Sequence, residues 1–112
     1  MKVVADDKIP FLKGVLEKEN IVVEYIPGAK TVCSDLADCD ALITRTRTKC
    51  NQALLAGAAV KFVATATIGF DHIDTDYLEK NSIAWTNAPG CNSSSVAQYM
   101  TSLLLNLAVK YN

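Results

Sequence analysis

The chain has 112 residues, of which 50% are hydrophobic and 21% charged, and its 11 basic and 12 acidic residues leave a formal net charge of −1. This length suits one domain with a sizeable core, and the composition is that of a globular rather than a disordered protein. Because there is no basic excess, neither nucleic acid nor an anionic membrane is expected as a partner.

Neither a targeting segment nor a membrane span is expected. The apolar run at the N-terminus is too short for a signal peptide, and Asp6 and Asp7 interrupt it. The longest apolar-rich segment, residues 96–109, is broken by four polar side chains, Gln98, Thr101, Ser102 and Asn106. It is not predicted to cross a membrane, so a cytoplasmic protein is expected.

The cysteines offer no obvious metal site or disulfide framework. Cys33, Cys39, Cys50 and Cys91 include no C-x-x-C pair, and the chain has a single histidine. A zinc site cannot be built from this spacing. We interpret all four as reduced, mostly buried thiols.

Short apolar runs rich in strand-forming residues alternate along the chain with helical patterns. Strands are predicted at residues 3–5, 21–26, 40–45, 60–67 and 83–86. Helices are predicted at residues 10–18, 52–57 (capped by Asn51) and 74–80, with a helical turn at 34–37 and a long last helix from residue 92 or 93 to about 110. This alternation predicts an α/β protein with a flavodoxin-like, three-layer architecture, in which helices cover both faces of a five-stranded parallel sheet.

Polar residues collect where the predicted strands end, which is the edge at which parallel sheets bind ligands. The loop at residues 45–49 reads RTRTK. Arginine offers a planar fork for a carboxylate or phosphate, and the neighbouring threonines add directed hydrogen bonds. The pattern is compatible with a site for a small dianionic ligand, although by itself it slightly favours a solvated polar loop.

The stretch at residues 61–74, KFVATATIGFDHID, runs from a strand through Gly69 into the start of a helix. Backbone N–H groups at such a turn can hold an anion, although an ordinary strand–turn–helix with a capping aspartate has the same pattern. His72 could be a general base, but a capping or hydrogen-bonding role at the helix entry is favoured. Trp85 is expected to belong to the core.

No glycine-rich nucleotide motif is present. Gly14, Gly28, Gly57, Gly69 and Gly90 nowhere form G-x-G-x-x-G or a P-loop. The chain by itself therefore carries no recognisable nucleotide site.

Four segments together resemble a known enzyme family: MKVVADDKIP, DALITRTRTKCNQALLAG, KFVATATIGFDHID and NAPGCNSSSVAQY. They are similar to the D-isomer-specific 2-hydroxyacid dehydrogenases, and within them to the branch that acts on 4-phosphoerythronate in pyridoxine synthesis. One departure is Gln98, which stands where the family usually has a glutamate.

The resemblance implies a two-domain enzyme that oxidises a 2-hydroxyl by hydride transfer to NAD. Residues 1–92 would be the flavodoxin-like substrate domain, and residues 93–112 the helix leading to a nucleotide domain. Arg45, Thr46 and Thr67 match substrate-contacting positions, and backbone N–H groups at Ile68 and Gly69 would hold the substrate carboxylate. The catalytic residues and the NAD site are expected beyond residue 112, so the chain alone is expected to be inactive.

Alternatives remain open at this point. Another D-2-hydroxyacid dehydrogenase, such as phosphoglycerate dehydrogenase, has a related pattern. A response-regulator receiver shares the fold and an acidic pair like Asp6 and Asp7, but needs an aspartate where Thr44-Arg45 stand. A non-catalytic interaction domain is the third alternative.

The last predicted helix has a broad apolar face. The face is formed by Val96, Ala97, Met100, Leu103, Leu104, Leu107 and Ala108. A helix on a small sheet normally buries one narrower stripe. We therefore expect a homodimer in which this face is covered.

Overall fold

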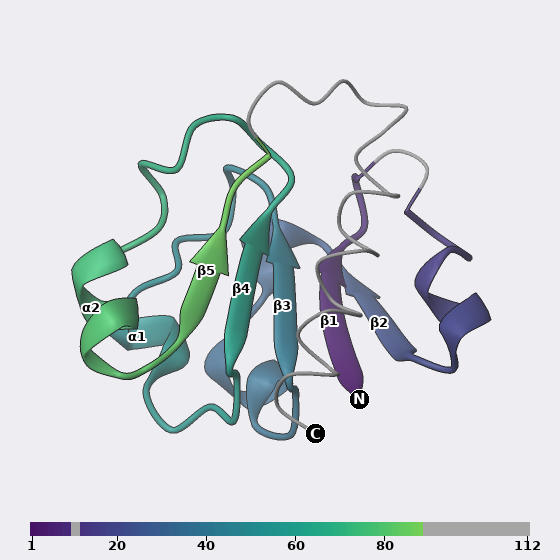
Figure 1. The fold of residues 1–112 in the computed structure, drawn as a ribbon, viewed down its shortest axis with the longest axis horizontal. Coiled ribbons are helices and arrows are strands. Elements are labelled where there is room, and N and C mark those ends of the chain that lie inside the picture. Colours follow the sequence, from purple (N-terminus) through teal and green to yellow (C-terminus); the bar gives the residue numbers. More distant parts are fainter. Residues whose placement is uncertain (10–11, 89–112) are drawn as a thin grey trace.

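The computed structural model describes residues 1–9 and 12–88, and these form one parallel sheet with helices on both faces (Figure 1). The strands are β1 (Lys2–Asp6), β2 (Val22–Ile26), β3 (Ala41–Thr44), β4 (Phe62–Thr65) and β5 (Ala84–Thr86). Their order in the sheet is β2-β1-β3-β4-β5, and every neighbouring pair is parallel. The predicted flavodoxin-like sheet is confirmed.

The helical elements are short. They are the 3₁₀ helices η1 (Leu16–Glu19), η2 (Gly28–Lys30) and η3 (Cys33–Leu36), and the α-helices α1 (Gln52–Leu55) and α2 (Thr75–Lys80). Asn51 caps α1 as predicted, since its side chain accepts from the Leu54 N–H at 3.2 Å. The predicted last helix lies outside the described residues. Within the described part of the chain, no helix is long and apolar enough to cross a membrane.

Alternate residues of the central strands build a core on each face of the sheet, because successive side chains of a strand point to opposite faces. Val3, Ala5 and Ile43 belong to the first core, together with Leu12 and Leu16 from the β1–β2 connection. The second core contains Val4, Leu42 and Val63, covered by apolar residues of η3, α1 and α2: Leu36, Leu54, Leu55 and Leu78. Burying each such leucine stabilises the fold by roughly 1.5–3 kcal/mol.

The helix predicted at residues 10–18 is wrong in the part that the structure describes. Residues 12–15 form a turn, and only the 3₁₀ helix η1 follows. Gly14 has a φ of 89°, a left-handed conformation that an α-helix cannot contain, and its N–H is taken by the Glu17 carboxylate at 3.0 Å. Leu12 and Leu16 are nevertheless buried, so the apolar spacing marked the core correctly.

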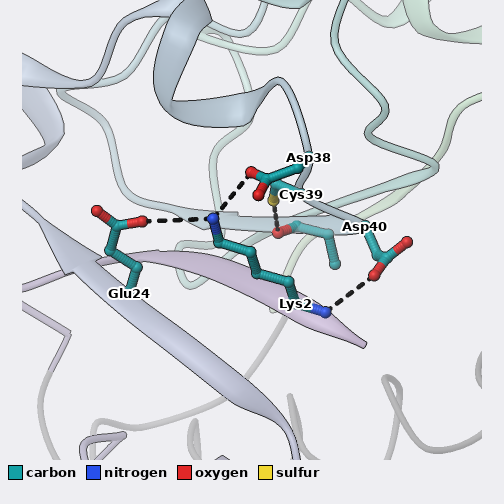
Figure 2. A network of polar contacts seen from close by, with 6 residues as sticks. Lys2, Glu24, Asp38, Cys39 and Asp40 are labelled. Atoms are coloured by element: carbon teal, nitrogen blue, oxygen red, sulfur yellow. Dashed lines mark hydrogen bonds and ion pairs between the residues drawn. The ribbon is translucent and has the colours of Figure 1, made fainter.

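At the amino edge of the sheet, Lys2 joins β1 to its neighbours (Figure 2). Its backbone N–H donates to Asp40 Oδ2 at 2.9 Å, and the Asp40 N–H donates to the Lys2 carbonyl at 2.8 Å. Its ammonium lies 2.8 Å from Asp38 and 3.8 Å from Glu24. Since the Lys2–Asp38 pair is exposed, its charges stabilise little, and the two hydrogen bonds between Lys2 and Asp40 set the alignment of β1 with β3.

At the opposite edge, Gly28 lies where three chain segments meet. A Cβ added there would overlap the Asp6 carboxylate and lie 2.9 Å from Thr48 Oγ1. The Thr48 hydroxyl donates to the Gly28 carbonyl at 3.0 Å, and both Asp6 and Thr48 are buried. The ends of β1 and β2 and the loop after β3 can approach this closely only because residue 28 has no side chain.

Replacing Gly28 with alanine should therefore destabilise the protein by about 1–3 kcal/mol, the usual cost of overpacking a closed site. Urea unfolding monitored by circular dichroism would measure it. Gly69→Ala is the matched control, because a Cβ at Gly69 meets nothing within 4 Å. Equal unfolding midpoints for the two variants would contradict the assignment.

Candidate anion-binding site

The carboxyl edge of the sheet is aligned by two buried threonines. Thr44 and Thr65 are the last residues of β3 and β4, are paired in register, and both have no exposed surface. The Thr44 hydroxyl donates to the Arg45 carbonyl at 2.9 Å, and the Ala66 N–H donates to the Thr44 carbonyl at 2.8 Å. The loop that starts at Arg45 and the turn that starts at Ala66 therefore leave the sheet side by side.

A cleft of about 350 Å³ opens between the ends of β1, β2 and β3. Its charged lining residues are Asp6, Asp7, Lys8, Lys30, Arg45 and Arg47. Four cations against two carboxylates give the lining a formal charge of +2. Such a cleft favours a small anionic ligand over a cationic one.

Arg45 is held at the cleft by one of its guanidinium nitrogens. Nη1 donates to the Lys8 carbonyl at 3.1 Å, and the side chain is half-buried. A guanidinium has five N–H donors, so this bond orients the fork and leaves others to bind an anion. Thr46 lines the same cleft and is exposed.

Asp6 closes the inner side of the cleft rather than forming an acidic centre. It is only 5% exposed, and its Oδ1 accepts from the Lys8 N–H at 2.8 Å. The neighbouring strand β3 ends at Thr44 and is followed by Arg45, so no aspartate stands there for phosphorylation. The receiver alternative therefore finds no support at this edge.

A second hollow, of about 360 Å³, adjoins the first and shares Gly28, Ala29 and Arg47 with it. Thr48, Lys49 and Cys33 also line it. Lys49 adds a positive charge to this edge, whereas, among the described residues, no carboxylate or histidine lines the second hollow.

The turn after β4 holds a chain of hydroxyl groups. Thr65 Oγ1 lies 2.6 Å from Thr67 Oγ1, and the Thr67 hydroxyl donates to the Gly69 carbonyl at 2.8 Å. Thr67 is half-buried and Gly69 is exposed, so this series of hydrogen bonds runs from the core to the surface. The sequence predicted Thr67 as a site residue and missed Thr65. The signal was present, because residues two apart on a strand point the same way.

His72 completes this chain from the other side. Its Nε2 lies 2.9 Å from Thr65 Oγ1, and its carbonyl accepts from the Cys50 N–H at 2.9 Å. The predicted hydrogen-bonding role is confirmed, whereas the cap of α2 is Asp74, which accepts from the Tyr77 N–H at 3.1 Å. Burial lowers the pKa of His72, and the charge of nearby Asp71 opposes that shift. The ring is thus mainly neutral at pH 7.

Apolar residues surround the turn on its outer side. Ile68 and Phe70 are 62% and 44% exposed. The Phe70 ring lies 5.0 Å from the Trp85 ring between centroids, and the Asn87 amide donates to the Ile68 carbonyl at 2.7 Å. Trp85 is half-buried against the second core, so the expectation that it belongs to the core is met in part.

The cysteines that the structure describes are unpaired thiols. Cys39 and Cys50 are buried and Cys33 is half-buried, while Cys91 lies outside the described residues. Burial raises the pKa of Cys50 to about 12, which makes it unreactive. Across residues 1–9 and 12–88, no group of acidic, histidine and cysteine side chains could hold a metal ion.

The predicted site residues therefore fall into two adjacent groups. Arg45 and Thr46 line the basic cleft, whereas Thr67 lies on the next turn and is not among the residues that line it. The backbone bond between Ala66 and Thr44 joins the two groups. Together they present cations and hydroxyl donors along one edge.

Known proteins resemble this chain over nearly its whole length. A family model, the catalytic domain of D-isomer specific 2-hydroxyacid dehydrogenases, matches residues 1–102. The chain is 56% identical over 107 residues to the erythronate-4-phosphate dehydrogenase of Bacteroides fragilis, covering 96% of this chain and 31% of that protein. It is 44% identical over 112 residues to the enzyme of that name from Shewanella amazonensis, covering 99% of this chain and 30% of that protein. The chain thus spans about a third of the length of these relatives.

Solved structures agree in fold. The D-lactate dehydrogenase from Aquifex aeolicus complexed with NAD and lactic acid matches with a TM-score of 0.66 at 25% identity, covering 96% of this chain and 33% of that one. The NAD-dependent formate dehydrogenase from Staphylococcus aureus matches with a TM-score of 0.70 at 22% identity over 94% of this chain and 38% of that one, which supports the fold alone. With a family model matched over most of its length, this chain belongs to the D-isomer specific 2-hydroxyacid dehydrogenase family.

Proposed function

We propose that this chain is the substrate-binding part of an NAD-dependent dehydrogenase that oxidises the 2-hydroxyl of 4-phosphoerythronate in pyridoxine synthesis. Relatives at 40–57% identity carry the name erythronate-4-phosphate dehydrogenase. Residues 1–92 are the substrate domain, and residues 93–112 lead to a nucleotide domain. In this reaction the C2 hydride passes to NAD and the hydroxyl loses its proton.

The observation that carries the proposal is the joint placement of the basic cleft and the threonine turn. 4-Phosphoerythronate has a phosphate at one end and a carboxylate at the other. A cleft with a formal charge of +2 suits the phosphate, with Arg45 and Thr46 as its donors. The turn at Thr67, which continues through the exposed residues Ile68 and Gly69, suits the carboxylate.

The chemical step itself falls to residues outside this chain. The Nε2 of His72 is bonded to Thr65 and the Asp6 carboxylate is buried, so neither side chain is placed as a free proton-transfer group at this edge. The residues of this edge bind and orient the substrate, and hydride transfer requires the NAD site proposed for the rest of the protein.

Replacing Arg45 with alanine in the complete protein should raise KM for 4-phosphoerythronate roughly 30- to 150-fold, the equivalent of about 2–3 kcal/mol in hydrogen bonds to charged groups. The change should appear in KM rather than kcat, because the proposed role is binding. Steady-state kinetics would measure both constants.

Two variants make this test specific. Arg45→Lys should recover only part of the loss, because it keeps the charge and loses the fork. Lys61→Ala removes an exposed cation just before β4, at the opposite edge of the sheet, and should leave KM nearly unchanged. An unaltered KM for Arg45→Ala would refute the assignment of Arg45.

The 112-residue chain alone should not bind NAD, because it contains no glycine-rich loop to hold a pyrophosphate. Isothermal calorimetry with NAD should show no heat of binding at micromolar protein. A micromolar dissociation constant would contradict the proposed division between the two domains.

We also propose a homodimer, from the sequence pattern of residues 93–112 alone. Leaving roughly 400 Å² of its apolar face in water would cost about 10 kcal/mol, which rivals the stability of a small domain. Light scattering on the 112-residue chain at micromolar concentration should therefore give twice the chain mass. A monomeric mass would rule out this mode of covering the face.

A further inference from the structure

The hydroxyl chain at the end of β4 has a determined hydrogen-bond direction. A carbonyl oxygen has no proton to give, so the 2.8 Å contact between Thr67 Oγ1 and the Gly69 carbonyl uses the Thr67 proton. A hydroxyl has only one proton. The 2.6 Å contact between Thr65 and Thr67 must then use the proton of Thr65.

The same count of protons determines which ring nitrogen of His72 is protonated. Because the Thr65 proton is directed to Thr67, the 2.9 Å contact between Thr65 Oγ1 and His72 Nε2 needs a proton on Nε2. Burial lowers the pKa of His72, so the ring carries one proton at neutral pH, and that proton is on Nε2 rather than Nδ1. A positively charged ring would also donate from Nε2, so the hydrogen bonds from His72 to Thr67 run in the same direction in both charge states.

The backbone holds His72 in place for this role. Its carbonyl accepts from the Cys50 N–H, and the Asp74 N–H donates to the Cys50 carbonyl, both at 2.9 Å. Residues 50 and 73 also form an isolated parallel bridge. The ring is thus presented to Thr65 by a segment anchored on both sides, and Thr65 itself has no exposed surface.

We propose that His72 is a positioning residue, which acts through Thr65 to make the Thr67 hydroxyl a donor toward a bound anion. This inference rests on the proposed function for the identity of the anion, the substrate carboxylate. When the anion arrives, the Thr67 proton turns from the Gly69 carbonyl to the anionic oxygen. Gly69 is exposed, so water replaces that bond.

The arrangement selects the kind of group that can bind. Since a lone pair of Thr67 is occupied by the Thr65 proton, Thr67 offers its own proton outward and favours acceptors such as carboxylate oxygens. Without the proton from His72, Thr65 can accept from Thr67 instead. The Thr67 proton would then point inward, and the site would lose a donor.

The first test is spectroscopic and needs no substrate. Nitrogen-15 NMR of the histidine ring in the complete, ligand-free protein, with the signal assigned by its loss in His72→Gln, should show the proton on Nε2. A neutral ring protonated on Nδ1 would overturn the proposal, whether or not the protein oxidises 4-phosphoerythronate. Inactivity toward that substrate would instead count against the proposed function.

The second test separates positioning from packing by kinetics. His72→Leu and Thr65→Val remove a donor and should each raise KM for 4-phosphoerythronate roughly 3- to 10-fold, with kcat changed less than twofold. His72→Gln and Thr65→Ser keep a donor at the same place and should stay within about twofold of the wild-type KM. The double variant His72→Leu, Thr65→Val should be no worse than either single change, because both interrupt one chain.

Thr86→Val is the matched control. It removes a half-buried hydroxyl from the end of β5 that donates, within the described part of the chain, to the adjacent Asn87 carbonyl alone, at 3.2 Å, and it should leave KM unchanged. If His72→Leu and Thr65→Val fold with a normal KM, the proposal is wrong. It is also wrong if His72→Gln raises KM as much as His72→Leu, which would mean that the ring only fills space. Should the leucine and valine variants fail to fold, the glutamine and serine variants and the NMR signal still decide.

Discussion

The register between β3 and β4 is the constraint on which the edge of this domain depends. All four residues of each strand are buried, and they pair from Ala41 with Phe62 to Thr44 with Thr65. A slip of one residue would turn every apolar side chain to the wrong face and is excluded by the two cores. The points where the Arg45 loop and the Thr67 turn leave the sheet are thereby fixed side by side, and the bond from the Ala66 N–H to the Thr44 carbonyl joins them.

Much of the fold could be predicted because the buried strands carry their own pattern. Short apolar runs such as residues 41–44 read as strands, and the Asn51 cap marks the start of α1. The segment at residues 10–18 could not be read correctly in the same way. Its leucines have helical spacing, but the left-handed Gly14 turns the chain, and spacing alone does not reveal the sign of one φ angle.

The candidate site also has a part that could be predicted from the sequence and a part that could not. Arg45, Thr46 and Thr67 could be picked out because they stand at the ends of predicted strands, where parallel sheets expose polar groups, and because the family resemblance matches them to substrate-contacting positions. The contact between Thr65 and His72, seven positions apart, could not, because it depends on how the stretch between them folds back, and that path is set by the bridge to Cys50. A sequence pattern identifies residues that share a strand face, whereas contacts across a loop require the tertiary structure.

The two halves of the edge have different electrostatic properties. The cleft carries exposed, long cationic side chains such as Lys8 and Lys30, whose attraction for an anion reaches through solvent and is weakened by salt. The series of hydrogen bonds from His72 to Thr67 is neutral overall and passes through the fully buried hydroxyl of Thr65, so salt hardly screens it. It contributes a hydrogen-bond donor of fixed direction rather than a charge. In our proposal, the first half draws in an anion with one strongly and one weakly charged end, such as a phosphorylated hydroxy acid, and the second half aligns it.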